Sequence, residues 1–235
     1  MTIECKVKAV VPLAPHTYKV VLQPPKPMAF KAGQYIQVCL SEQDQRPFSI
    51  ANRPGDPDIE LHIGAADANP WALQVVEYAT TQKANDGGVA ISLPQGEAYL
   101  RESSVRPIVL VAGGTGFTYV RSILLQLLQR PRTEPIFVYW GARDFAQLYA
   151  DAEMQALAQQ HSHLSYVPIV EQATAAWSGK VGNVLDVVSD DFISLEAYDI
   201  YLCGRFEMAG AARERFSAEK GAQIAHMYAD AFSFI

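Results

Sequence analysis

The sequence predicts two domains, an antiparallel β-barrel or sandwich followed by a doubly wound parallel α/β domain. Before about residue 100, short runs alternate polar and apolar residues, which is typical of half-buried strands. Beyond residue 106, continuous apolar runs alternate with helical stretches, which is typical of a parallel sheet covered on both faces. A polar stretch separates the two patterns, so we place the domains at residues 1–103 and 104–235.

The strands of the first half are recognised by their period of two and by the turn residues between them. Prolines at 24, 25 and 27 and the Pro54-Gly55-Asp56-Pro57 turn interrupt the pattern. One helix is expected to begin after Asn69, because asparagine is a good N-cap and Pro70 suits the first helical position. The predicted strands cover residues 3–9, 18–22, 34–40, 59–63 and 89–93, with another opening near Arg46.

In the second half, strands and helices alternate at the spacing of βαβ units. The run Ile108-Val109-Leu110-Val111-Ala112 is the first and most apolar strand. Further strands are predicted at 136–140, 166–170 and 199–203, and helices near 122–128, 151–160, 184–188 and 207–220. This alternation predicts a parallel sheet whose ligands gather at the carboxyl ends of the strands.

Composition narrows the class of protein. Hydrophobic residues make up 49% of the 235 residues and charged residues 19%, which is ample apolar material for a core. A net charge of −6 argues against a surface that binds nucleic acid. The three cysteines are too scattered for a metal site or disulfide framework, and no secretory signal or membrane-length apolar run occurs. We expect a soluble cytoplasmic protein with no metal and no nucleic-acid or membrane partner.

The most informative single motif is Gly113-Gly114-Thr115-Gly116, directly after the first strand of the second half. Glycines let the backbone approach a ligand closely, and the following helix start offers N–H groups to an anion. The loop therefore predicts a dinucleotide pyrophosphate site, although its spacing matches neither GxGxxG nor a Walker loop. The alternative is a tight turn with no ligand. Arg121 then faces the phosphates or lies in solvent.

Two further strand ends are expected at the same edge. Arg143, after the second strand, pairs with a 2′-phosphate or is a solvated surface residue. Cys203, Gly204 and Arg205 end the last predicted strand. A buried cysteine is commonly inert core, but at this position Cys203 would pack against a nicotinamide ring, with Gly204 leaving room for it.

The tetrapeptide Arg46-Pro47-Phe48-Ser49 is weak evidence alone, but it becomes specific beside the Gly113–Gly116 loop and the Cys203-Gly204-Arg205-Phe206-Glu207-Met208 segment. With these motifs the chain resembles the ferredoxin–NADP reductase superfamily. Over essentially all 235 residues it is similar to the bacterial NAD(P)H:flavin oxidoreductases, which include the flavin reductases associated with luciferase.

The resemblance implies a six-stranded antiparallel flavin-binding barrel, a nucleotide-binding α/β domain, and chemistry in the cleft between them. It implies that Ser49 sits beside flavin N5 as the catalytic residue, and that Arg46 lies near the ribityl or phosphate side. It places Thr115, Gly116 and Cys203 near the nicotinamide. The remaining flavin contacts that it implies are Tyr35, Pro47, Phe48 and the segment His62, Ile63, Gly64 and Ala65, largely through backbone groups. His62 is alternatively a strand residue that faces solvent.

The function that follows is an NAD(P)H-dependent flavin reductase. Hydride transfer needs no protein nucleophile or metal, because NADH or NADPH and the flavin carry the reactive atoms. Only Asp67, Ala68 and Asn69 separate the strand from the helix, which leaves little room for an adenine pocket. We therefore expect riboflavin and FMN, and FAD as well, to exchange as substrates. The reduced flavin would then reach acceptors such as a monooxygenase, luciferase or ferric complexes.

Two alternative functions stay open at this point. The first is a reductase component that passes electrons to a separate iron–sulfur or oxygenase partner. The second is a non-catalytic module that senses NAD(P). The apolar residues Phe232, Phe234 and Ile235 either close the last strand or the interdomain core, or an aromatic among them shields the flavin.

Overall fold

The protein is described by a computed structural model, which covers residues 2–65 and 69–235. Two compact units make up the chain. We call Met1–Leu100 with Arg121–Gln126 the barrel unit, and Arg101–Val120 with Leu127–Ile235 the α/β unit. The barrel unit thus includes a short segment from far along the chain. A boundary at residues 103 and 104 stays a prediction.

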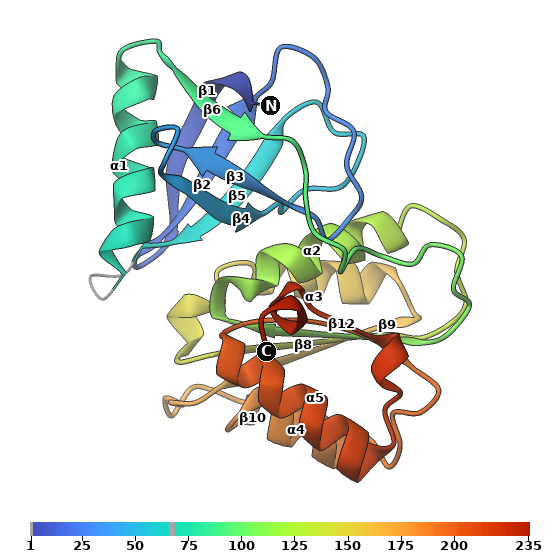
Figure 1. The fold of residues 1–235 in the computed structure, drawn as a ribbon. Coiled ribbons are helices and arrows are strands. Elements are labelled where there is room, and N and C mark those ends of the chain that lie inside the picture. Colours follow the sequence, from blue (N-terminus) through green and yellow to red (C-terminus); the bar gives the residue numbers. More distant parts are fainter. Residues whose placement is uncertain (1, 66–68) are drawn as a thin grey trace. The chain divides into compact units, whose positions relative to one another are not determined.

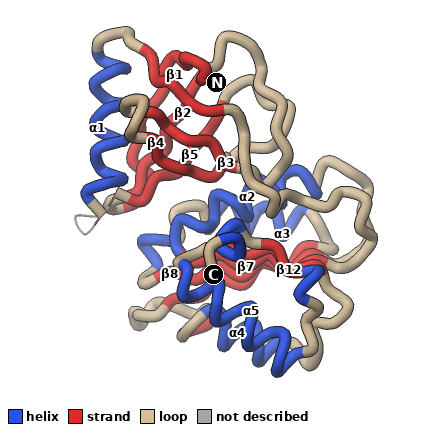
Figure 2. Tube along the Cα trace, in the orientation of Figure 1, coloured by secondary structure: helices blue, strands red, loops and turns tan. Residues whose placement is uncertain are grey.

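The barrel unit is built on one six-stranded sheet (Figures 1 and 2). Its strand order is β4-β3-β6-β1-β2-β5, and every ladder within it is antiparallel. Just beyond β4, the Ala51 N–H donates to the Glu60 carbonyl in β5 over 2.8 Å, which brings the two ends of that order together. The predicted six-stranded antiparallel barrel is confirmed. Its strands are β1 (Thr2–Ala14), β2 (Thr17–Gln23), β3 (Tyr35–Cys39), β4 (Gln45–Ser49), β5 (Ile59–Gly64) and β6 (Gly88–Ser92).

The first strand is longer than its sequence predicts. We expected this strand to cover residues 3–9, but β1 continues through Pro12 to Ala14 and pairs Pro12 with Tyr18 of β2. The register shifts between Pro12 and Ala14. Proline lacks the N–H that a regular ladder requires, so it is tolerated where the ladder is irregular.

Helix α1 (Pro70–Ala84) packs on the barrel core and contributes to burying the apolar face of the strands. The Asn69 side chain accepts a hydrogen bond from the Ala72 N–H over 3.3 Å, which confirms the predicted N-cap. Ala72, Val75, Val76 and Ala79 are buried in the same cluster as the inward-facing residues of the strands. The short connection through Asp67 and Ala68 lies outside the described residues.

The α/β unit contains a second six-stranded sheet in the order β10-β9-β8-β7-β11-β12, with parallel pairing throughout. Helices α4 and α5 lie together on one face and α3 on the other (Figure 1). The predicted doubly wound sheet is confirmed. Its strands are β7 (Ile108–Gly113), β8 (Ile136–Ala142), β9 (Leu164–Val170), β10 (Lys180–Val181), β11 (Asp199–Cys203) and β12 (Met227–Tyr228), and its helices are α2 (Phe117–Leu127), α3 (Asp151–Gln160), α4 (Val184–Asp191) and α5 (Phe206–Lys220). Of these, α2 runs through both units.

The sheet register aligns three strand ends at the carboxyl edge. Ala112 of β7 pairs with Trp140 of β8 on one side and with Cys203 of β11 on the other. The loops after these three strands therefore start at one level of the sheet. None of the helices in the described part of the chain is long and apolar enough to cross a membrane.

Candidate functional site

The glycine loop follows β7 as the sequence predicts. Gly114–Gly116 forms a short 3-10 turn, and α2 begins directly after it at Phe117. The first N–H groups of a helix have no partner within the helix, so this start offers donors to an anion. The α/β unit thereby places the loop at the same sheet edge as Arg143 and as Cys203, Gly204 and Arg205.

Two positions of the loop, Gly114 and Gly116, are occupied by glycine for different structural reasons. A Cβ on Gly116 would lie 2.2 Å from the Cys203 carbonyl oxygen, so the loop passes directly against the end of β11. Gly114 has a φ of +54°, and no atom in the described part of the chain lies within 4 Å of its Cβ position. The backbone at Gly114 thus has open space beside it, as a site for a bulky pyrophosphate requires.

Trp140 supports this loop from the sheet and was not predicted as a site residue. Its side chain is fully buried, and its Nε1–H donates to the Gly114 carbonyl oxygen over 2.9 Å. The Phe117 ring stacks on the indole, with centroids 3.8 Å apart and planes 10° apart. An apolar aromatic in a buried strand is ordinary core material, so its sequence position alone does not signal this role.

The thiol at the end of β11 is a weak acid. Burial, assisted by the negative charge of Asp230, raises the pKa of Cys203 to about 12. Cys203 therefore stays protonated at neutral pH and behaves as a small apolar group. Beside it, the Met208 sulfur would lie 2.7 Å from a Cβ on Gly113 and 2.5 Å from one on Gly204, so Met208 fills the space between the two loops.

Arg143 lies at the predicted edge in an exposed position. Two-thirds of its side chain is open to solvent, and its Nε is 3.2 Å from Asp144 Oδ2. Phe145, two residues after Arg143, is 52% exposed. Among residues 2–65 and 69–235, the Arg143 side chain is thus held by a surface ion pair alone, which is a weak restraint.

In the barrel unit, Ser49 ends β4 and pairs with Tyr35 of β3. Both side chains are half-buried. Among residues 2–65 and 69–235, no side chain or backbone group hydrogen-bonds to the Ser49 hydroxyl. That hydroxyl is therefore available to a ligand. Pro47 is exposed. The ring centroid of Phe48 lies 5.8 Å from that of Trp71, a residue at the start of α1.

Arg46 is far less available than its place in the motif suggests. Its side chain is only 6% exposed and ion-pairs with Asp44, and α1 supplies further acceptors through the Trp71 carbonyl and Gln74 Oε1. Asp44, Trp71 and Gln74 were not predicted as site residues. Gln74 is 28 residues away in the chain, so no local pattern links it to Arg46.

His62 faces out of the barrel wall, since Leu61 and Ile63 belong to the core cluster and alternate strand residues face opposite ways. It is nevertheless 93% buried, and its Nε2 lies 2.8 Å from Glu60 Oε1. The alternative of a solvent-facing His62 is therefore wrong. Burial lowers the pKa of His62 and outweighs the opposing hydrogen bond and charge of Glu60.

Arg121 places a positive charge beside Glu60, the partner of His62. We expected Arg121 to face phosphates or solvent, but it belongs to the barrel unit, where its Nη1 donates to the Ala51 carbonyl over 3.0 Å and lies 3.5 Å from Glu60 Oε1. Burial acts to raise the pKa of Glu60, but the hydrogen bond from His62 and the charge of Arg121 outweigh it and bring that pKa below its usual range.

In the segment after His62, the side chains offer little to a ligand, and its flavin contacts stay a prediction from the resemblance. Ile63 points into the core, and Ala65 is buried with its N–H donating to the His16 carbonyl over 2.6 Å. Gly64 pairs with Thr17 of β2. Contacts from this segment would therefore be made by main-chain atoms.

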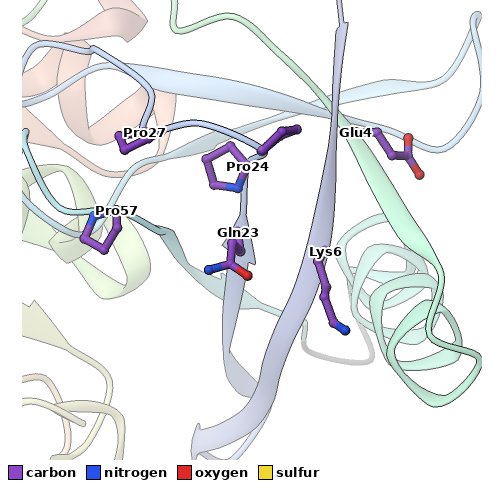
Figure 3. Close-up of a pocket in the computed structure, with 7 residues that line it drawn as sticks. Glu4, Lys6, Gln23, Pro24, Pro27 and Pro57 are labelled. Atoms are coloured by element: carbon purple, nitrogen blue, oxygen red, sulfur yellow. The ribbon is translucent and has the colours of Figure 1, made fainter.

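A cavity of about 450 Å³ opens elsewhere on the barrel unit, between β1 and the proline-rich loop after β2 (Figure 3). None of the predicted flavin residues lines it. It combines one carboxylate and one ammonium, and Lys6 is already paired with Asp86 at 2.8 Å. We assign it no part in the site. The labelled residues around it are Glu4, Lys6, Gln23, Pro24, Pro27 and Pro57.

After β12 the chain forms a 3-10 turn at Asp230–Ser233, which includes Phe232, so the apolar C-terminal residues do not extend the last strand. Phe234 is 74% exposed and lies 5.9 Å from the Phe206 ring at the start of α5, centroid to centroid. Phe232 is half-buried against the α/β core.

Comparison with known proteins agrees with both units. Residues 110–214 match the family model described as an oxidoreductase NAD-binding domain. A ferredoxin NADP+ reductase from Neisseria gonorrhoeae, solved with bound FAD and NADP, has the same fold: its TM-score is 0.78 at 18% identity, covering 93% of this chain and 91% of that one.

Two curated relatives match from end to end. A protein named NAD(P)H-flavin reductase from Vibrio harveyi is 54% identical over 237 residues, and one of the same name from Aliivibrio fischeri is 52% identical over 237 residues. Each alignment covers all of both chains. At this identity and coverage, the chain belongs to the NAD(P)H-flavin reductase family.

Proposed function

We propose that this protein transfers a hydride from NADH or NADPH to a free flavin and releases the reduced flavin. The observation that carries the proposal is the Ser49 hydroxyl, which lies half-buried at the end of β4 and has no hydrogen-bond partner among the described residues. The two relatives that match this chain from end to end are named NAD(P)H-flavin reductase. The α/β unit supports the nucleotide half through the Gly113–Gly116 loop.

The reaction moves two electrons and one proton as a hydride from nicotinamide C4 to flavin N5, and solvent supplies the second proton. The reacting atoms must come within about 3–3.5 Å of each other. In our proposal Ser49 donates a hydrogen bond at N5, where it orients the flavin and stabilises the developing charge. The loop from Gly113 to Gly116 holds the pyrophosphate, and Cys203, with Gly204, packs against the nicotinamide.

The flavin is proposed as an exchangeable substrate. With an association rate of about 10⁶ M⁻¹s⁻¹, a micromolar complex dissociates at about 1 s⁻¹, whereas a nanomolar complex takes about a thousandfold longer. Export of reduced flavin needs the faster regime. We propose that monooxygenases, luciferase or ferric complexes take up the product, and that the protein works in the cytoplasm, whose reducing conditions suit three unpaired cysteines.

The test is NAD(P)H oxidation with and without added riboflavin, FMN or FAD, on wild type, Ser49→Ala and Ser49→Thr. We expect no turnover without added flavin, and a loss of about 10²–10³ in kcat for Ser49→Ala, equivalent to about 2.7–4 kcal/mol. Ser49→Thr keeps a hydroxyl and should retain most of the activity. Wild-type kcat in Ser49→Ala would remove Ser49 from the reaction. Stoichiometric flavin that survives gel filtration would contradict the exchange of substrate.

A further inference from the structure

The Arg46 guanidinium is enclosed by acceptors of its own chain. Its Nε donates to Asp44 Oδ1 over 2.7 Å, and its Nη2 donates to Asp44 Oδ2 over 2.5 Å. This is the bidentate geometry in which a guanidinium binds a carboxylate most strongly. It is also the geometry that a phosphate would use. Asp44 therefore occupies the face of Arg46 that would otherwise bind an anion.

Helix α1 supplies the remaining acceptors. Nη2 also donates to Gln74 Oε1 over 2.7 Å, and Nη1 donates to the Trp71 carbonyl. The guanidinium carbon lies 5.1 Å from the Trp71 ring centroid. A guanidinium has five N–H donors, and these contacts engage four of them. We call Asp44, Gln74 and the Trp71 carbonyl the Arg46 cage.

The charges are arranged against an incoming phosphate. The Arg46 side chain is 6% exposed, whereas that of Asp44 is 40% exposed. Solvent thus meets the negative partner first. The hydrogen bond from Arg46 lowers the pKa of Asp44, so the carboxylate stays ionised at neutral pH. A phosphate would have to displace this carboxylate and overcome its repulsion before reaching the cation.

The position of β4 makes this relevant to a flavin. Among the described strands, β4 forms a ladder with β3 alone, and the barrel closes on β5 just beyond it, where the Ala51 N–H donates to the Glu60 carbonyl. A ligand along the side of β4 that has no ladder can meet side chains from both faces of the strand. Arg46 and Ser49 are three residues apart on it, or roughly 10 Å along an extended chain. A ribityl chain with its phosphate can span that distance.

We propose that Asp44, assisted by Gln74, prevents Arg46 from binding the 5′-phosphate of flavin nucleotides. In this way it lowers the preference for FMN relative to riboflavin. The inference deepens the proposed function and rests on it, with the flavin placed along β4. Asp44 and Gln74 are positioning residues, since they act through Arg46. Once Asp44 loses its charge, the two N–H groups of Arg46 that it holds are released and can donate to the phosphate.

The experiment compares riboflavin and FMN on wild type, Asp44→Asn, Asp44→Ala, Asp44→Glu and Gln74→Leu. For each flavin we would measure kcat/KM, and separately Kd by quenching of flavin fluorescence without NAD(P)H. For Asp44→Asn and Asp44→Ala we expect the preference for FMN over riboflavin to rise about tenfold, both in kcat/KM and in binding affinity. The kcat/KM and Kd for riboflavin itself should change less than threefold. Gln74→Leu should give a smaller gain, and Asp44→Glu should keep the wild-type ratio.

Two controls make the assignment to Arg46 specific. In the double variant Asp44→Ala with Arg46→Ala, the FMN gain should vanish, because no cation remains to be released. Asp86→Asn removes a carboxylate from the exposed ion pair with Lys6 on the same unit and should leave the ratio unchanged. Inorganic phosphate should compete with FMN more strongly in Asp44→Ala than in wild type.

Equal changes for riboflavin and FMN in the Asp44 variants would show a merely structural role and overturn the inference. So would an FMN gain that persists without Arg46. If neither Asp44→Asn nor Asp44→Ala folds, an unchanged ratio in Gln74→Leu would overturn it. A wild type that binds flavins but turns none over would instead contradict the proposed function, while the binding ratios still test the Arg46 cage.

Discussion

The Trp140 indole N–H donates to the Gly114 carbonyl over 2.9 Å, so a buried residue of β8 fixes the loop that follows β7. Trp140→Phe removes this donor and keeps an aromatic ring against Phe117. We expect KM for NAD(P)H to rise several-fold with KM for riboflavin unchanged. The lost hydrogen bond should cost about 0.5–1.5 kcal/mol of stability.

Tyr166→Phe is the matched control for this variant. It removes a hydrogen bond of 3.0 Å to Asp151 in the same unit, away from the glycine loop. Its stability should fall by a similar amount while both KM values stay at the wild-type level. Equal effects of Trp140→Phe on the two KM values would show that Trp140 does not act through the loop.

Substitution of Gly116 tests the close contact with β11. In Gly116→Ala the new Cβ would collide with the Cys203 carbonyl, and backbone on both sides must shift. We expect a loss of about 1–3 kcal/mol in the free energy of unfolding, measured by urea denaturation. Gly114→Asn is the comparison, because its Cβ meets open space and asparagine tolerates a positive φ. A Gly116→Ala protein as stable as Gly114→Asn would refute the steric account.

The buried Glu60–His62 pair predicts a pH dependence of stability. His62 has a lowered pKa in the folded protein, so between that pKa and the usual value of about 6.5 the unfolded chain binds more protons. Glu60 also has a lowered pKa, so its contribution is present above its usual range and is lost on further acidification. Stability should therefore fall as pH drops below about 6.5.

The measurement is the urea midpoint of wild type and His62→Gln at neutral pH and at mildly acidic pH. Glutamine can still donate to Glu60 but does not titrate, so the variant should lose less stability over the first part of this range. An identical loss in both proteins would exclude His62 as the titrating group.

The protonated state of Cys203 predicts slow thiol chemistry. Because its pKa is raised to about 12, the thiolate fraction is negligible at neutral pH. Iodoacetamide should modify Cys203 in the folded protein at less than one-hundredth of the rate of free cysteine, followed by mass spectrometry of the peptide. Cys203→Ser should keep measurable NAD(P)H oxidation in the presence of riboflavin, since no nucleophile is needed. Rapid alkylation of Cys203 would contradict the burial argument.

The strand and helix pattern is strong enough in this sequence to predict both units. The run from Ile108 to Ala112 is buried on both faces, which explains its continuous apolar character. Pro12 shows the limit of local reasoning, because a proline is a strand breaker only where the ladder is regular.

The site residues also fall into two groups, those that the sequence indicates and those that only the fold brings together. The glycine loop and the tetrapeptide ending in Ser49 are contiguous, so sequence alone indicates them. The Arg46 cage joins β4 to α1, and Arg121 reaches the loop after β4 from 70 residues away. Such contacts depend on the folded topology. A charged residue near a motif therefore looks free in the sequence when the fold has already paired it.

The inclusion of Arg121–Gln126 in the barrel unit affects how this family can be recombined. The Ser122 hydroxyl donates to the Asn52 carbonyl over 2.7 Å, next to the Arg121 bond to Ala51. A chimera joined at residue 103 would inherit both donors from the foreign half. If that half lacks them, two main-chain acceptors lose their partners, at about 1–3 kcal/mol each where water cannot replace the bond. Productive exchange of halves thus needs crossovers on either side of that helical segment.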